Sequence, residues 1–139
     1  MPANPLGWRL WLIALLGATG VMAGAFAAHG LRGRVPDAQL LIWETAADYQ
    51  LLHTVVLLAL LGVRNHLAEG ASQRWLGAAE SLFVGGILVF SGSLYLLVLT
   101  ATPLLGAVTP VGGLALIAGW ASLAVAGLSH RKTSPNSAQ

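Results

Sequence analysis

The sequence predicts an all-α integral membrane protein, built as a bundle of four transmembrane helices. Only 9% of its 139 residues are charged and 56% are hydrophobic, with a mean hydropathy of +0.75. A soluble domain carries about 25% charged residues, because it must keep a large surface wet. Two stretches lack charged residues and histidine, the 49 residues 81–129 and the 19 residues 10–28. They supply the roughly 20 apolar residues that a spanning helix needs.

The first span is predicted at residues 6–28. Asn4 followed by Pro5 is typical of a helix start, with proline at the first helical position. The segment also resembles a signal peptide, because Arg9 precedes the apolar run and Ala25–Ala27 resembles a cleavage site. The uncharged run is long for a signal peptide, so we interpret it as a retained span.

Three further spans follow from the positions of charges, tryptophans and prolines. They are predicted at residues 43–63, 75–100 and 110–129. Trp43 marks an interface, and Thr109–Pro110 repeats the pattern of a cap followed by proline. We expect a single domain, residues 1–132, and a disordered polar tail, residues 133–139.

The basic residues predict the orientation of the four spans. An even number of spans places both termini and the middle loop on one side, which holds Arg9, Arg64, Arg74, Arg131 and Lys132. The other side holds only Arg32 and Arg34. Because short cytoplasmic segments are enriched in Lys and Arg, we expect both termini in the cytoplasm.

A histidine lies deepest among the ionisable residues of the predicted spans. Ten residues separate His53 from Trp43, which places it about 15 Å below the interface by helix rise. Tyr49 precedes His53 by four residues, so their side chains share a helix face. Such groups are expensive in a membrane and each needs a partner or a function.

Three acidic residues accompany this histidine. Glu44 and Asp48 lie in the first turns of the second span, with Arg32 and Arg34 as their expected partners. Glu80 lies on the third span about 7–8 Å inside the cytoplasmic edge by helix rise. Its expected partners are Arg9 and Arg74.

Two interpretations compete for these residues. In the first, neighbouring hydroxyls, carbonyls and arginines satisfy them, so that they fix the helix register. In the second, Glu80, His53, Asp48 and Glu44 form a proton relay or bind a polar head group. We favour the structural interpretation, because nothing in the sequence brings the four onto one face.

Small residues at helical spacing predict where the helices approach each other. The stripes are Gly17, Gly20, Gly24 and Ala28; Gly77, Ser81, Gly85 and Gly92; and Ala115 with Gly119. We expect them to hold one bundle together, with a homodimer seam as the alternative. Gly112–Gly113 could bind an anion at a helix N-terminus, although helix capping accounts for them better.

Several kinds of site are absent from the sequence. There is no cysteine, so no disulfide or thiolate metal site can form. The histidines fall on different sides of the membrane, with His29 apart from His66 and His130. No catalytic triad, phosphate loop or haem motif is present, and the basic residues form no nucleic-acid-binding face. We therefore expect no catalytic residue, metal, cofactor or nucleic-acid partner.

Four segments in order resemble one family of small membrane proteins. They are Gly24–Leu31, Trp43–Ala46 with Tyr49, Gln50 and His53, Phe90–Tyr95, and Thr109–Gly113 with Ala118–Trp120. Together they resemble the YgdD-like family of uncharacterised bacterial inner-membrane proteins, to which a small eukaryotic transmembrane protein is also similar. Ala27 departs from the glycine common there. The resemblance implies a four-span inner-membrane protein and supplies no activity.

The resemblance includes most of the polar residues expected in the outer half of the bundle. If spans two and three are antiparallel neighbours, Tyr95 lies near the depth of Asp48 and Tyr49. The predicted cluster is Asp48, Tyr49, Gln50, His53, Ser91, Ser93 and Tyr95, with His29 and the Arg32 loop as its lid.

The residues favour a non-enzymatic function. We expect either an accessory protein of a larger complex or a binder of a lipid-like ligand through the outer cluster. The alternative is a small transporter or proton-conducting channel that uses Glu80 and His53. The expected partners are the lipid bilayer and either a membrane protein or a second copy of the chain.

The orientation is directly testable. A reporter enzyme that is active only in the periplasm, fused after Gln139, should stay inactive, because the five-to-two basic bias places the C-terminus in the cytoplasm. A cytoplasm-active reporter at the same position is the control and should be active. The opposite pair of results would reverse the topology.

Overall fold

The computed structural model describes the backbone of residues 5–66 and 70–133, and the side chains of residues 6–64 and 70–129. Every element in these ranges is helical, which confirms the predicted all-α class. The four long helices are α1 (Pro5–Phe26), α2 (Asp37–His66), α3 (Ala71–Thr100) and α4 (Thr109–Thr133). A π-helical turn, Ala27–Leu31, continues α1, and a 3-10 helix, Pro103–Ala107, precedes α4.

All four helices are long and apolar enough to cross a membrane. Each predicted span lies inside a helix, although α2 begins six residues before Trp43 and α3 four residues before Trp75. The helices extend beyond the apolar runs, because a helix satisfies its own backbone hydrogen bonds both in lipid and outside it. The predicted tail lies outside the described residues, except that α4 ends at Thr133.

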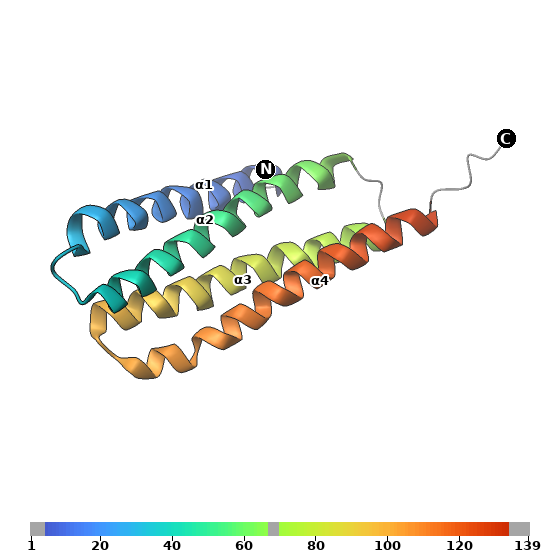
Figure 1. The fold of residues 1–139 in the computed structure, drawn as a ribbon. Helices are drawn as coiled ribbons and strands as arrows, with labels where there is room; N and C mark the ends of the chain where they lie inside the picture. The colour runs from blue at the N-terminus through green and yellow to red at the C-terminus, as the bar shows by residue number, and fades with distance from the viewer. Residues whose placement is uncertain (1–4, 67–69, 134–139) are drawn as a thin grey trace.

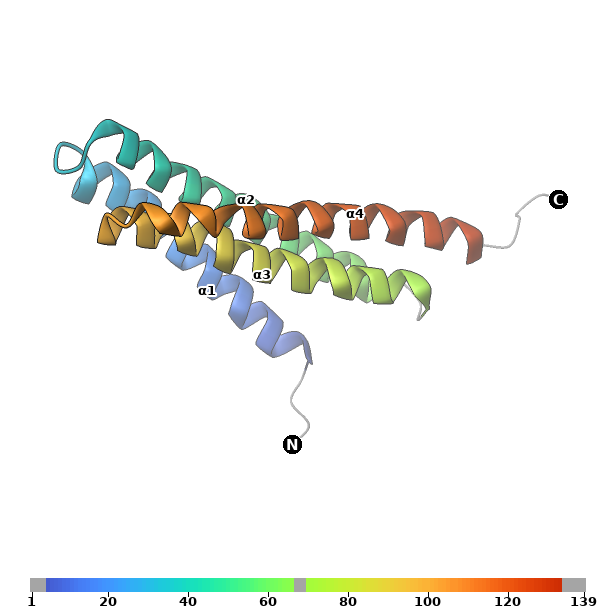
Figure 2. The same ribbon diagram turned by 90° about the horizontal axis from the view of Figure 1, so that it is seen from below.

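The helices form two antiparallel hairpins, α1 with α2 and α3 with α4, joined through α2 and α3 (Figure 1). The bundle is not closed. Within the described residues, no Cα atom of α1 lies within 8 Å of one in α3 or α4. Figure 2 shows α1 diverging from α3 and α4 toward its N-terminal end. We call the end with both chain termini the termini end, and the opposite end the loop end.

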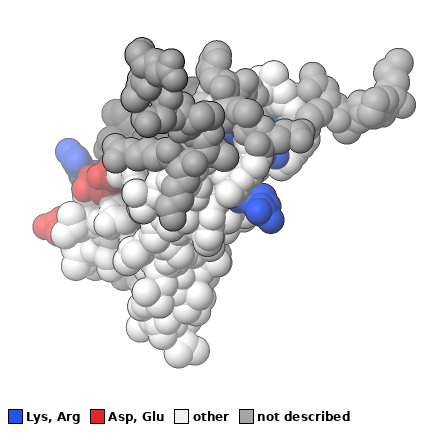
Figure 3. Space-filling model, turned by 90° about the vertical axis from the view of Figure 1, so that its right-hand side faces the viewer, with Lys and Arg blue, Asp and Glu red and all other residues white. Residues whose placement is uncertain are grey.

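Apolar side chains fill the middle of the bundle. The main core cluster joins all four helices and includes Leu16, Leu57, Phe83 and Leu116. A second cluster near the loop end contains Leu31, Trp43 and Val98. Many large apolar side chains face outward on every helix, and such flanks suit lipid. In the view onto the termini end, Lys, Arg, Asp and Glu groups stand at the edges of the described surface (Figure 3).

Glycines set the close approach of α3 and α4. A Cβ atom on Gly112 would lie 2.7 Å from the Phe90 Cα, and one on Gly119 would lie 2.7 Å from the Phe83 ring. Gly86 is equally tight against Leu116. Gly112, which the sequence suggested as a capping or anion-binding residue, therefore also has a packing role.

The predicted stripes of small residues divide into packed and open positions. Gly20 packs on Leu51 of α2, where a Cβ atom would come within 2.7 Å, and Gly119 packs on α3. By contrast, a Cβ atom on Gly24, Gly85 or Gly92 would meet no atom of another residue within 4 Å beyond its own stretch of helix. The structure thus assigns only part of each stripe to packing within the chain.

Substitution of Gly112 tests the α3–α4 contact. Gly112→Ala should lower the free energy of unfolding in detergent by about 1–3 kcal/mol, because the new methyl group meets backbone that cannot easily move. Gly127→Ala is the matched control on the same helix, since nothing lies within 4 Å there. Equal stability of the two variants would contradict this account of the contact.

Candidate functional site

A buried glutamine links three helices near the loop end. The Gln50 amide nitrogen donates hydrogen bonds to the Leu16 carbonyl and the Thr19 hydroxyl of α1, each at 2.8 Å. The Tyr95 hydroxyl of α3 donates to the Gln50 amide oxygen at 2.9 Å. Because donors and acceptor are all used, this side chain is well suited to fixing helix positions.

Trp43 reinforces the same joint. Its indole nitrogen donates a 2.8 Å hydrogen bond to the Ala23 carbonyl of α1. Its ring lies 5.4 Å from that of Phe26 and 4.6 Å from that of Tyr95, measured between centroids. A tryptophan predicted to mark an interface is therefore buried at the junction of α1, α2 and α3.

The two serines predicted in this region make helix-to-helix contacts. The Ser91 hydroxyl donates to the Ala46 carbonyl of α2 at 2.8 Å. Ser93 lies 2.8 Å from the Thr109 hydroxyl, at the start of α4. Both side chains are buried, so they hold α3 to its two neighbours.

His53 is buried and its two ring nitrogens both have partners. Nδ1 lies 2.8 Å from the Tyr49 carbonyl, which only accepts, and Nε2 lies 3.4 Å from the Trp120 indole nitrogen, which only donates. These partners assign the proton to Nδ1 of a neutral imidazole. The predicted contact with Tyr49 is confirmed, since the two rings stack at 5.8 Å.

The remaining predicted residues at the loop end make no hydrogen bond to this cluster within the described side chains. Arg32 pairs with Glu44 as expected, at 3.7 Å, between an exposed arginine and a half-buried glutamate. Asp48 is exposed and, among the described side chains, has no ion pair with Arg34. His29 is exposed on the π-helical turn, and its expected role as part of a lid stays a prediction.

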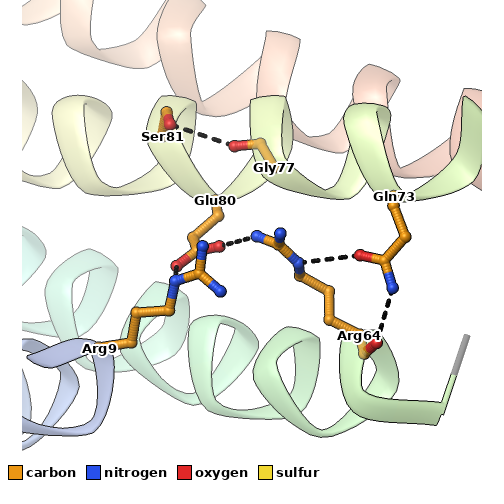
Figure 4. Close-up of polar contacts among 6 residues, drawn as sticks. All are labelled: Arg9, Arg64, Gln73, Gly77, Glu80 and Ser81. Atoms are coloured by element: carbon orange, nitrogen blue, oxygen red, sulfur yellow. Dashed lines mark hydrogen bonds and ion pairs between the residues drawn. The ribbon is translucent and has the colours of Figure 1, made fainter. Parts of the chain in front are cut away.

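The termini end carries an ionic cluster around Glu80 of α3 (Figure 4). Its Oε1 atom lies 3.1 Å from Arg9 Nε of α1, and its Oε2 atom accepts a hydrogen bond from Arg64 Nη1 of α2. The contact of Arg9 with Glu80 is an ion pair without hydrogen-bond geometry, so the Arg9 Nε–H has no hydrogen-bond acceptor. Gln73 Oε1 accepts a hydrogen bond from Arg64 Nε and its amide donates back to the Arg64 carbonyl.

The expected Glu80 pairing is thus half right. Arg9 is a partner, whereas Arg74 is exposed and pairs with nothing acidic in the described part of the chain. Six residues separate Arg74 from Glu80, which places them on different faces of α3. Arg64 takes its place because α2 remains helical to His66, so Arg64 lies on a helix face rather than in a loop.

Two hollows lie between α1 and α3, with α2 behind them. The termini-end hollow, about 590 Å³, is lined by Trp8, Arg9, Leu12, Arg64, Gly77, Glu80, Ser81, Val84 and Gly85. The loop-end hollow, about 410 Å³, is lined mainly by apolar groups and by Thr19, Gln50, Ser91 and Tyr95. The two follow each other along the same pair of helices, because Leu12 and Val84 line one and Leu16 and Ile87 the other. We call them together the α1–α3 groove.

No cluster of three or more metal-ligating side chains occurs in the part of the chain that the structure describes.

Removing the Gln50 amide tests its structural role. Gln50→Met keeps the length of the side chain but deletes three interhelical hydrogen bonds. At about 0.6 kcal/mol for each such bond in a membrane, we expect a loss of about 2 kcal/mol in the free energy of unfolding. Gln39→Met, in the first turn of the same helix, is the control and should change stability little. A fully stable Gln50→Met variant would argue against this joint.

Comparisons with known proteins agree on one family. The family described as "Protein of unknown function (DUF423)" matches residues 23–113. A UPF0382 membrane protein of Staphylococcus aureus is 43% identical over 119 residues, which cover 83% of this chain and 93% of that protein. The UPF0382 membrane protein YwdK of Bacillus subtilis is 39% identical over 107 residues, covering 77% and 85%. No solved structure matches.

The predicted resemblance to an uncharacterised family of small membrane proteins is therefore confirmed. With four helices long and apolar enough to span a membrane, and relatives named as membrane proteins, this chain belongs to the DUF423 family of membrane proteins of unknown function.

Proposed function

We propose that this protein is a non-enzymatic binder of a lipid-like molecule, which it holds in the α1–α3 groove. It would lie in the bacterial inner membrane with both termini in the cytoplasm. The observation that carries the proposal is the open arrangement of the bundle. The groove lies between two helices whose backbones do not approach each other, and it combines apolar walls with an ionic cluster at one end.

The groove suits an amphiphile better than a soluble ligand. Leu12, Val84 and Gly85 line the termini-end hollow beside the charged groups, and the loop-end hollow continues with mainly apolar side chains. By helix rise, Arg9 to Ala23 spans about 21 Å. This exceeds the half of the about 30 Å hydrocarbon core that one leaflet contributes. One acyl chain could therefore lie along the groove.

The polar cluster at the loop end contributes less to binding than the sequence suggested. Gln50 uses its amide on three partners, and Ser91 and Ser93 are bonded to neighbouring helices. A ligand would have to replace these bonds. We therefore place the head group at the ionic cluster and assign the loop-end cluster to helix packing.

Hydrogen bonding opposes the alternative of a proton relay through Glu80 and His53. Protonation of His53 at Nε2 would point that N–H at the Trp120 N–H, so one of the two donors would lose its acceptor. In the described residues, no hydrogen-bonded side chains connect His53 with Glu80. A transporter function has no comparable observation in its favour.

Filling the groove tests the proposal. The protein extracted in mild detergent should retain a lipid-sized mass in native mass spectrometry. Gly85→Leu should lower the retained fraction about tenfold, or about 1.4 kcal/mol, because the new side chain enters the hollow without a clash. Gly127→Leu places the same side chain on an exposed position of α4 and is the control.

The outcomes of this experiment separate the alternatives. Wild-type protein with no bound lipid, or equal loss in both variants, would refute binding in the groove. Stoichiometric retention of another protein in place of lipid would favour an accessory role, and proton flux into liposomes by the isolated chain would favour a channel.

A further inference from the structure

We infer that the termini-end hollow recognises the head group of a phospholipid of net negative charge, whose phosphate contacts Arg9 and Arg64. This inference rests on the proposed lipid binding and adds the chemical class of the lipid and the residues that select it. It follows from the charge balance of the cluster, from its unused hydrogen-bond donors and from its depth in the membrane.

The cluster carries more positive than negative charge. Arg9 and Arg64 both contact Glu80, whose two carboxylate oxygens are each taken by one arginine. The exposed fraction of the side chain is 24% for Arg9, 18% for Arg64 and 17% for Glu80. Two guanidinium groups and one carboxylate leave a net charge of +1. An anion that pairs with the guanidinium groups would balance this charge and be bound favourably.

The arginines also retain donors for such an anion. Each guanidinium has five N–H groups in a planar fork that suits phosphate oxygens. Arg64 uses Nε on Gln73 and Nη1 on Glu80. Within the described residues, the Nη2 atom of Arg64 and both Nη atoms of Arg9 make no hydrogen bond. Arg9 and Arg64 both line the hollow beside the cluster.

Gly77 helps to keep the Arg64 guanidinium accessible, because it places no side chain beside it. A Cβ atom at Gly77 would lie 3.7 Å from Nη1 and 4.0 Å from Nη2, the nearest side-chain atoms to that position. The missing side chain therefore leaves space beside the guanidinium on α3. On the other wall, the Arg9 guanidinium carbon lies 5.5 Å from the centroid of the Trp8 ring, which holds it by a cation–π contact.

The depth of the cluster fits a lipid head group. Arg64 lies two residues before the end of α2, about 3 Å by helix rise, and Arg9 lies four residues after the start of α1. Trp8 and Trp75 at this end are exposed, as in the aromatic belt of a membrane interface. A phosphate at this level would leave its acyl chain beside Leu12, Val84 and Gly85. This continuity favours a phospholipid over free phosphate.

Competition between two lipids tests the inference. Detergent-solubilised protein is incubated with equal amounts of phosphatidylglycerol and phosphatidylcholine of identical acyl chains, and the bound lipids are quantified by native mass spectrometry. Wild-type protein should retain phosphatidylglycerol about tenfold better, a difference of about 1.4 kcal/mol. The two lipids carry the same chains, so the ratio reports the head group alone.

Arg9→Gln should abolish this preference. Glu80 keeps Arg64 as its partner in this variant, so the net charge of the cluster falls to zero without an unpaired carboxylate. Arg9→Lys keeps the charge and should retain most of the preference. Arg74→Gln removes an exposed arginine at the same end outside the cluster and should leave the ratio unchanged. Circular dichroism and gel filtration identify any variant that fails to fold, and the competition with wild-type protein then remains the test.

The results distinguish failure of this inference from failure of the proposed function. Equal retention of both lipids would overturn the head-group preference and leave lipid binding intact, whereas retention of neither would refute the proposed function itself. Loss of preference in Arg74→Gln would indicate general surface attraction and overturn the site. Displacement of phosphatidylglycerol by excess inorganic phosphate would show that the arginines bind phosphate without a lipid, and would overturn the assignment to a phospholipid.

Discussion

Everything in this structure depends on how helices are joined when no water drives them together. In lipid, close packing at small residues and interhelical hydrogen bonds replace the hydrophobic effect as the main attraction. Each pair of neighbouring helices has such a joint. Gly20 and Gln50 join α1 to α2, Ser91 joins α2 to α3, and Gly112 joins α3 to α4 with Gly86 and Gly119. The α1–α3 groove lies between two helices that are not packed together in this way. Among the described side chains, the polar contact between α1 and α3 that lies nearest the termini end is that of Arg9 with Glu80.

The sequence was sufficient for the helices because their lengths follow from one-dimensional information. Long apolar runs bounded by charges, tryptophans and prolines predict spans without knowledge of neighbours, and the residues of all four predicted spans are helical. The partner of Glu80 needed three-dimensional information. Arg64 follows an uncharged run and therefore resembles the stop of a span, but α2 continues to His66 and aims that side chain across to α3. Which helices are neighbours, and how they are rotated, is not contained in the hydropathy pattern.

The contacts of the polar residues likewise divide into those that local sequence spacing predicts and those that only the three-dimensional fold reveals. Tyr49 and His53 were correctly paired because both lie on one helix at a spacing of four residues. The second partner of His53, Trp120, lies 67 residues away on α4 and has no local signal. His29 was predicted as part of a lid over the cluster, which stays a prediction; the fold adds that its π-helical turn leaves the side chain exposed.

The degree to which buried polar groups are satisfied separates structural from functional candidates here. Gln50 and His53 have a partner for each polar atom of their side chains, so occupying them with a ligand would cost existing bonds. The Glu80 cluster has two cations for one anion, and the buried Arg9 Nε–H, which lies 3.1 Å from Glu80 Oε1, makes an ion pair there without hydrogen-bond geometry. Because a buried donor without a partner costs free energy, such a group persists most readily where something else completes it. The incompleteness of this cluster, beside an open groove with apolar walls, is the physical reason for assigning ligand binding to it.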